Sequence, residues 1–113
     1  MLEAIIGGAS VFVPAVWRLE LVNALVVAER RKKISPAKST KFLDDLQKFR
    51  ITVDTDGLHH VFGAVLEQAR LYQRSAYDAS YLELAQRRGL PFATRDEPLR
   101  SAALRLGLSL FQP

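Results

Sequence analysis

Three acidic residues, Glu20, Asp78 and Asp96, have the types and places in the sequence to carry out chemistry together. Glu20 is the only charged residue between Leu19 and Ala28, in a stretch that is apolar on every side. Such a stretch is typical of a helix packed inside a protein. An ionised carboxylate buried without a partner costs several kcal/mol, or its pKa shifts until it is neutral. Glu20 therefore needs a cation, which is an arginine, a lysine or a metal ion.

The same three acids also have purely structural explanations. Ser75 followed by Asp78 fits a capping box, in which the acid returns a hydrogen bond to the N–H of the serine. Asp96 can cap a helix that begins at Glu97-Pro98. For Glu20 the alternative is a buried ion pair, and its candidate partners are Arg18, Arg74 and Arg95.

The combination of the three acids favours one shared site. Asp78 lies in the first turn of a predicted helix on its inward face, Asp96 follows a predicted strand, and Glu20 lies early in a helix that follows another strand. Ligands of open parallel sheets bind beyond the carboxyl ends of the strands, so the three acids can converge there. Carboxylates without cysteine or a suitably placed histidine favour Mg²⁺ or Mn²⁺ over Zn²⁺. Such an ion activates water and neutralises charge on a phosphodiester.

Short strands alternating with helices must position these acids. Strands are predicted at 11–13, 51–53, 90–93 and 108–111, where short apolar runs occur. Residues 2–8 are expected to be the tail of a helix that ends at Gly7-Gly8. Further helices are predicted from after Pro14 to 30–33, from Ser35-Pro36 to about 49, through 58–72, from Ser75 to Gly89, and over 97–106.

The inward faces of two of these helices follow from their apolar spacing. They are Phe42, Leu46 and Phe49 in one helix, and Leu58, Val61, Phe62, Val65, Ala69 and Tyr72 in the other. The fold class expected from this order is α/β, with a short parallel sheet covered by helices on both faces.

Composition limits the classes of protein that the chain can belong to. With 113 residues it is long enough for one modest domain, expected over 1–113. It has no cysteine, no membrane-spanning run and no signal-peptide pattern, which agrees with a cytoplasmic protein. A net charge of +4 weakly favours a polyanionic partner. Arg30, Arg31, Lys32 and Lys33 are either a solvated helix end or, with Arg18, Arg87, Arg88, Arg95 and Arg100, part of a phosphate-binding surface.

Two segments carry a resemblance to a known family. Tyr-Asp-Ala-Ser-Tyr-Leu-Glu-Leu-Ala at 77–85, followed by Gly-Leu-Pro-Phe-Ala-Thr-Arg-Asp at 89–96, resembles the C-terminal half of PIN-domain nucleases. The particular likeness is to the VapC-type toxins of toxin–antitoxin pairs. Residues 14–25 are similar to the second acidic motif of that family, a Glu early in the helix after a strand that ends in Pro.

This resemblance implies a three-layer α/β/α fold and a Mg²⁺- or Mn²⁺-dependent endoribonuclease. It also implies a homodimer and inhibition by a small antitoxin protein that wraps the surface. Carried over by position, Glu20, Asp78 and Asp96 would bind the metal, and Thr94 would be a supporting polar residue near the site.

The N-terminal region departs from the family pattern. PIN domains begin with a strand that ends in an Asp, and nothing before Val11 resembles it, since the first acid is Glu3. The chain is therefore interpreted as an N-terminally truncated domain, whose strands near 11–13 and 90–93 lack their usual shared neighbour. Open edges of this kind favour pairing with another chain. We expect either closure of the sheet by dimerisation or strand exchange, or a shortened reading frame.

Three functions remain as alternatives at this point. The first is a VapC-type ribonuclease that uses the three acids. The second is a non-catalytic PIN-like protein that retains a dimerisation or antitoxin-binding role, because one metal-ligand Asp is missing. The third, an unrelated receiver-like domain, lacks support because no phosphoacceptor Asp follows a strand near the start.

Overall fold

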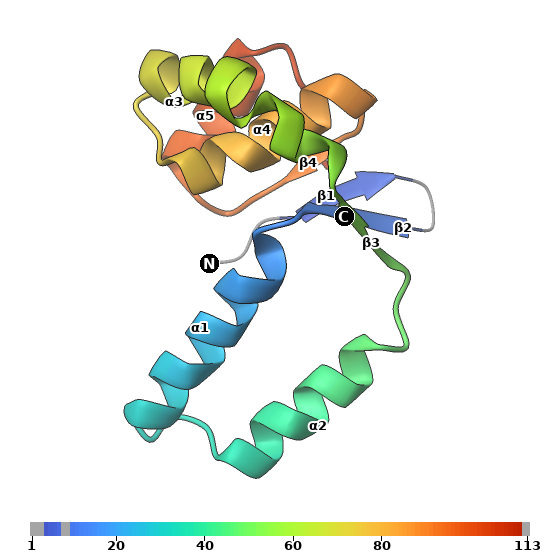
Figure 1. The fold of residues 1–113 in the computed structure, drawn as a ribbon, viewed down its shortest axis with the longest axis vertical. Helices are drawn as coiled ribbons and strands as arrows, with labels where there is room; N and C mark the ends of the chain where they lie inside the picture. Colours follow the sequence, from blue (N-terminus) through green and yellow to red (C-terminus); the bar gives the residue numbers. More distant parts are fainter. Residues whose placement is uncertain (1–3, 8–9, 112–113) are drawn as a thin grey trace.

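The computed structural model describes residues 4–7 and 10–111 (Figure 1). Its strands are β1 (Ala4–Gly7), β2 (Ser10–Pro14), β3 (Ile51–Asp54) and β4 (Phe92–Ala93). Its α-helices are α1 (Trp17–Arg30), α2 (Pro36–Leu46), α3 (Leu66–Tyr72), α4 (Ala76–Arg88) and α5 (Glu97–Arg105). A 3₁₀ segment, η1 (Asp56–His60), and a π-helical segment, η2 (Val61–Val65), lead into α3.

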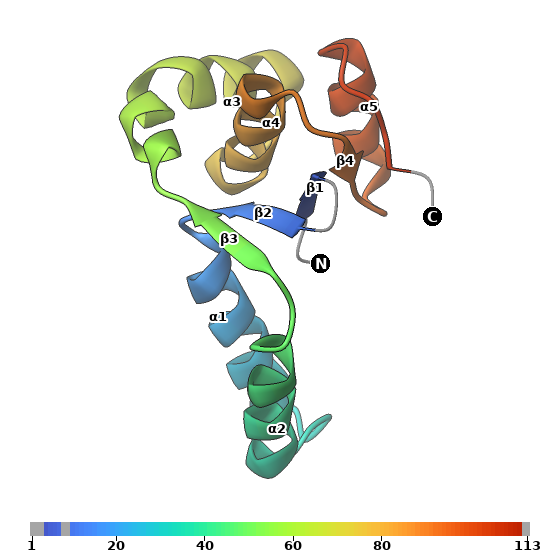
Figure 2. The same cartoon turned by 90° about the vertical axis from the view of Figure 1, so that its right-hand side faces the viewer.

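The four strands form one mixed sheet in the order β3-β2-β1-β4. β2 and β3 pair in parallel, with Val11 opposite Ile51, whereas β1 is antiparallel to both β2 and β4. Figure 2 shows α3 and α4 on one side of the sheet and α1 and α2 on the other. The α/β class and a parallel strand pair are thus confirmed, with antiparallel pairings added by β1.

The N-terminal segment differs from its predicted structure. Residues 4–7 are a strand rather than the tail of a helix, while residues 2, 3 and 8 of that prediction lie outside the described residues. The glycines at 7 and 8 resemble a helix stop, but Ile5 and Ile6 are β-branched and suit a strand.

Strand β1 also overturns the expectation of open edges. It lies between β2 and β4, so the strands at 10–14 and 92–93 do share a neighbour within the chain. The predicted strand at 108–111 is reduced to a single parallel bridge between Leu110 and Phe92.

The main core lies between α4, β4 and α5. Ser75 caps the start of α4 by accepting a hydrogen bond from the N–H of Asp78, and Gly89 ends the helix with a φ of 64°. This left-handed conformation suits glycine. The fully or almost fully buried side chains of this core are Tyr81, Leu82, Leu84, Ala85, Phe92, Leu99, Ala102 and Ala103.

Helices α1 and α2 form an arm that extends away from the sheet and the α3–α5 body (Figure 1). Leu21 is the only buried residue of α1, and Leu19 is 73% exposed. On the second helix Phe42 is exposed, as is Phe49 just beyond it. The sequence predicts both helices to be packed, and the structure corrects this. Trp17 at the start of α1 packs against the main core, whereas Val22 farther along the helix is 48% exposed.

Fewer apolar side chains are buried in the segment from η1 to α3 than the apolar spacing predicts. Val65 is buried as expected, but Phe62 is 94% exposed and Leu58 is also exposed. The 3₁₀ and π-helical turns explain this, because their residues per turn differ from 3.6 and the predicted face does not stay aligned. Across the described ranges, no helix combines the length and apolarity that crossing a bilayer requires.

Candidate functional site

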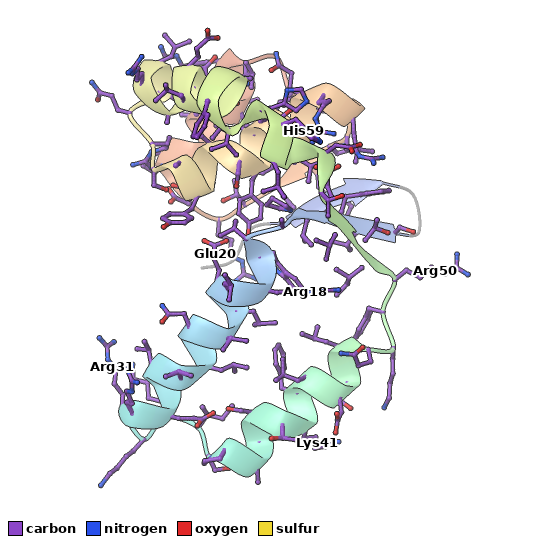
Figure 3. All side chains as sticks on the ribbon, in the orientation of Figure 1. Arg18, Glu20, Arg31, Lys41, Arg50 and His59 are labelled. Carbon is purple, nitrogen blue, oxygen red and sulfur yellow. The ribbon has the colours of Figure 1, made fainter. Side chains whose placement is uncertain are left out.

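Glu20 is held by a tyrosine rather than by a cation. It lies in the first turn of α1, at the end of the arm that meets the body (Figure 3). The hydroxyl of Tyr81 on α4 donates a hydrogen bond of 2.6 Å to Oε1 of Glu20. No lysine or arginine of the described residues lies within ion-pair distance of this carboxylate. The predicted burial of Glu20 is therefore wrong, since Glu20 is only half-buried. The alternative of an ion pair with Arg18, Arg74 or Arg95 does not hold either, because the partner of Glu20 is a phenol.

Asp96 fulfils its predicted structural role at the start of α5. Its Oδ1 accepts a hydrogen bond of 3.4 Å from the N–H of Leu99, and its own N–H donates to Oγ1 of Thr94 at 3.0 Å. The same Oδ1 lies 3.8 Å from Nη1 of Arg74. Thr94 thus fixes the backbone from which the Asp96 carboxylate projects.

Asp78 makes only half of the predicted capping box. Its N–H donates to Oγ of Ser75 at 3.0 Å, but its carboxylate accepts no hydrogen bond from any described residue. Burial raises the pKa of Asp78, the positive charge of Arg74 opposes this rise, and the negative charge of Asp96 adds to it. A partly buried acid beside a second acid is a common feature of functional sites.

All three acids lie near the N-terminal half of α4. Asp78 and Tyr81 are one helical turn apart, so the hydrogen bond from Tyr81 brings Glu20 to the same part of α4. Asp96 is close enough to Asp78 for their charges to interact. Within residues 4–7 and 10–111, however, no three acids or histidines are close enough together to hold a metal ion.

The chemistry of these donors fits a hard divalent cation. All three are carboxylates, and the negative charges of Asp78 and Asp96 repel each other. Oxygen donors of this type suit Mg²⁺ and Mn²⁺. The pair Asp78 and Asp96 is the centre of the candidate site, with Glu20 beside it.

Six of the basic residues proposed to contact phosphate are exposed and lie in two places. Arg18 and the run of Arg30, Arg31, Lys32 and Lys33 lie on the arm, whereas Arg95 follows β4 near Asp96. Residues 17–50, which include the arm, contain nine Lys and Arg and four Asp and Glu. The rest of the chain contains seven and eight, so the arm carries all of the net positive charge.

Sequence reasoning missed a buried ionic network at the end of β3. Asp54, whose side chain is 1% exposed, accepts hydrogen bonds from Nη2 of Arg87 at 2.6 Å and from the N–H of Gly57 at 3.0 Å. Arg87 also donates from Nε to Glu83 at 2.7 Å, and Arg88 donates from Nε to Asp54 at 3.4 Å. Arg87 is therefore held in ion pairs with two buried carboxylates, which corrects its assignment to a phosphate-binding surface.

The ionisation of this network follows from its contacts. Burial alone raises the pKa of Asp54, but the hydrogen bonds from Arg87, Gly57 and Arg88 outweigh it and hold that pKa below its usual range. The hydrogen bonds to Glu83 and Asp54 raise the pKa of Arg87. One local signal was available in the sequence, namely Glu83 and Arg87 at the i, i+4 spacing of a helical ion pair.

A pocket of about 170 Å³ lies beside this network. It is mainly apolar and contains none of the three predicted metal-binding acids, so it is distinct from the candidate site. Its lining residues are Pro14, Ala15, Val16, Asp54, Gly57, Leu58, Val61, Val65, Ala76, Tyr77, Ser80 and Glu83.

Comparison with known proteins gave one match. The family model described as the PIN domain matches residues 1–104. Neither the search of curated proteins nor the search of solved structures found a match. PIN domains are generally nucleases, they typically use divalent metal ions, and many of them pair with antitoxins.

Proposed function

Because the chain belongs to the PIN domain family, we propose that it is a Mg²⁺- or Mn²⁺-dependent endoribonuclease of the VapC toxin type. The observation that carries this proposal is the pair Asp78 and Asp96. Asp78 is partly buried, accepts no hydrogen bond from the described residues, and lies beside a second acid that raises its pKa. A group in that environment is suited to holding a cation.

In this proposal Asp78, Asp96 and Glu20 bind the metal ion. Thr94 supports Asp96 through its hydrogen bond to the Asp96 N–H, and Tyr81 orients Glu20. A divalent ion held by these residues would supply a water of lowered pKa and would offset negative charge on the phosphate. The water oxygen forms a bond to phosphorus, one P–O ester bond of the RNA breaks, and the leaving oxygen takes the proton that the water loses.

The basic arm supports RNA as the substrate. Arg18 and the run from 30 to 33 are exposed on one projecting element, and Arg95 lies next to Asp96. Such a distribution suits contact with a phosphate backbone, since cations that neutralise phosphates supply most of the affinity that does not depend on sequence.

The apolar surface of the arm supports a protein partner. A groove of about 320 Å³ lies between α1, α2 and β3, and Trp17, Leu21, Leu46 and Phe49 are among its lining residues. Apolar faces left open on a monomer are typical of interaction surfaces. We assign this groove to a small antitoxin, with a homodimer as the state of the free protein and the cytoplasm as its location.

The test is replacement of Asp78 by Asn. We expect Asp78→Asn to weaken Mn²⁺ binding, measured by calorimetry, by about tenfold or more, and to abolish cleavage of a structured RNA, because one of the two carboxylates of the acid pair is lost. Asp44→Asn is the matched control, since Asp44 is exposed on α2 and its removal changes the net charge equally. Cleavage that persists in Asp78→Asn would contradict the proposal.

One observation favours a second function, a non-catalytic PIN-like protein that binds an antitoxin or a second copy. Asp96 already accepts the hydrogen bond that caps α5, and its Oδ1 lies 3.8 Å from Arg74. The described residues also contain no group of three metal donors. Mn²⁺ binding by the wild-type protein without any RNA cleavage would support this second function and contradict the first.

A further inference from the structure

Arg74 occupies a fixed position between two helices at the edge of the candidate site. Gln73 ends α3 with a left-handed φ of 53°, and Ser75 caps the start of α4. The N–H of Arg74 donates to the carbonyl of Ala69 at 3.1 Å. Its backbone is therefore held at both sides, and only the side chain can change position without disturbing the helices.

The guanidinium of Arg74 is close to the acids but only weakly bound to them. Nη1 lies 3.8 Å from Oδ1 of Asp96, which is too long for a hydrogen bond. Nε donates to the carbonyl of Gln73 at 3.1 Å, and no other hydrogen bond joins this guanidinium to a described residue. The side chain is 25% exposed, so its remaining donors are open to water.

Arg87 shows what a structural arginine looks like in the same protein. Its nitrogens lie 2.6 Å from Asp54 and 2.7 Å from Glu83, and these two acceptors are almost fully buried. Arg74 lacks such contacts although two carboxylates are near. A guanidinium that has a counter-ion but retains unused donors is poised to bind a second anion, since planar pairs of N–H groups match phosphate oxygens.

We propose that Arg74 is a phosphate-binding residue of this site, which serves as the counter-ion of Asp96 and Asp78 until a divalent ion takes up the two carboxylates. With a divalent ion on the two carboxylates, the guanidinium would be attracted to them less strongly. It then binds a non-bridging oxygen of the RNA phosphate that lies next to the acids, where it stabilises the charge that develops during water attack. This inference rests on the proposed function and adds a residue to it.

The proposal predicts opposite effects on metal binding and on turnover. We expect Arg74→Gln to bind Mn²⁺ about threefold more tightly in calorimetry, because a competing cation of a partly exposed ion pair is removed. We expect the same variant to cleave RNA about 100-fold more slowly at saturating Mn²⁺, because a donor to the phosphate is lost. A residue with a purely structural role would not strengthen metal binding.

Arg70→Gln is the matched control, because Arg70 is exposed on α3 and its removal changes the charge equally. We expect it to leave both quantities near the wild-type values. Arg74→Lys keeps the charge without the planar fork, so we expect wild-type Mn²⁺ affinity and turnover about tenfold lower. If Arg74→Gln does not fold, Arg74→Lys is the variant to measure. RNA turnover equal to that of the wild type in Arg74→Lys would then overturn the role of Arg74.

Failure of this inference is distinguishable from failure of the proposed function. If the wild-type protein binds Mn²⁺ and cleaves RNA while Arg74→Gln behaves like Arg70→Gln, only the role of Arg74 is wrong. Weaker Mn²⁺ binding by Arg74→Gln than by the wild type also overturns that role. If the wild-type protein neither binds Mn²⁺ nor cleaves RNA, the proposed function and this inference are both wrong.

Discussion

Asp54 and Asp78 are two aspartates of one fold whose pKa values shift in opposite directions. Burial raises the pKa of each. Asp54 receives hydrogen bonds from two arginines and an N–H, and these lower its pKa overall. Asp78 accepts none from the described residues and is close to Asp96. The first environment favours a permanent ion pair, and the second favours an acid that can receive a cation.

Asp54 should contribute to stability in a pH-dependent way. We expect Asp54→Asn to lower the free energy of unfolding at pH 7 by about 3 kcal/mol, because it leaves the charge of Arg87 poorly compensated next to the core. The folded pKa of Asp54 is lower than its unfolded value of about 3.9. Its stabilisation is therefore complete above the unfolded pKa and is lost as the pH falls through the folded pKa.

Urea unfolding of both proteins at pH 7 and at successively lower pH values measures this effect. The difference in unfolding free energy between the wild type and Asp54→Asn should shrink as the solution becomes more acidic than pH 3.9, the approximate unfolded value. A difference that stays constant through the acid range would show that the Asp54 charge is not what stabilises the network.

Asp78 should make metal binding sensitive to acid. A carboxylate must lose its proton to bind a divalent ion, and the pKa of Asp78 is raised by burial and by Asp96. We therefore expect Mn²⁺ affinity to be greatest above this raised pKa and to decline as the pH falls through it. In folding, the sign is the reverse of that for Asp54, because the folded state binds the Asp78 proton more tightly than the unfolded state does.

Calorimetric titration of Mn²⁺ between pH 4 and pH 8 tests the effect of Asp78 on binding. The decline should begin at a higher pH than that expected for an ordinary aspartate of pKa about 3.9. Asp78→Asn should remove most of this dependence, whereas the exposed control Asp44→Asn should keep it. An unchanged pH profile in Asp78→Asn would show that another group controls metal binding.

At the scale of single elements, the sequence correctly predicted the helix starts and ends that depend on residues close together in the chain. Ser75 and Gly89 bound α4 as expected, and Ser35 caps α2 with Pro36 as its first residue. Asp96 caps α5, again as expected. Each of these features depends on hydrogen bonds between residues within a few positions of one another, so residue type and spacing are sufficient to predict them.

The features that were missed depend on partners far away in the chain. Strand β1 pairs with β2 on one side and β4 on the other, and although Ile5 and Ile6 suit a strand, nothing local at residues 4–7 encodes these two partners. Tyr81 and Glu20 are separated by 61 positions, and Arg87 and Asp54 by 33. The site acids were thus identified from residue type and family motif, but their hydrogen-bond partners were not.

The whole molecule consists of a compact body, which carries the candidate site, and a positively charged arm. Its principal dimensions are 40 × 29 × 27 Å, and the arm lies along the longest axis (Figure 1). Helix α1 runs 14 residues from near Glu20 to the basic run, which corresponds to about 21 Å. An RNA strand that is cut near Asp78 and also contacts the tip of the arm must span several nucleotides.

This separation predicts that the tip of the arm contributes to RNA affinity without contributing to chemistry. We expect the double variant Arg31→Gln with Lys33→Gln, made in Asp78→Asn to prevent cleavage, to bind single-stranded RNA more weakly at low salt. Its plot of log affinity against log salt should be shallower by about 1.4, because each lost phosphate contact on a single strand removes about 0.7.

The matched control for the arm is Lys41→Gln with Lys48→Gln, which removes two charges on or just beyond α2. Both lysines already pair with Asp45, at 3.6 and 3.3 Å, so they are less available to phosphate. Fluorescence anisotropy with a labelled oligonucleotide across a salt series gives the slopes. The control should keep a slope close to that of the parent. If RNA contacts the tip of the arm, the Arg31 and Lys33 variant must lose more RNA affinity than the control. Equal losses of affinity in the two double variants would indicate instead that RNA binding depends only on the total charge of the arm.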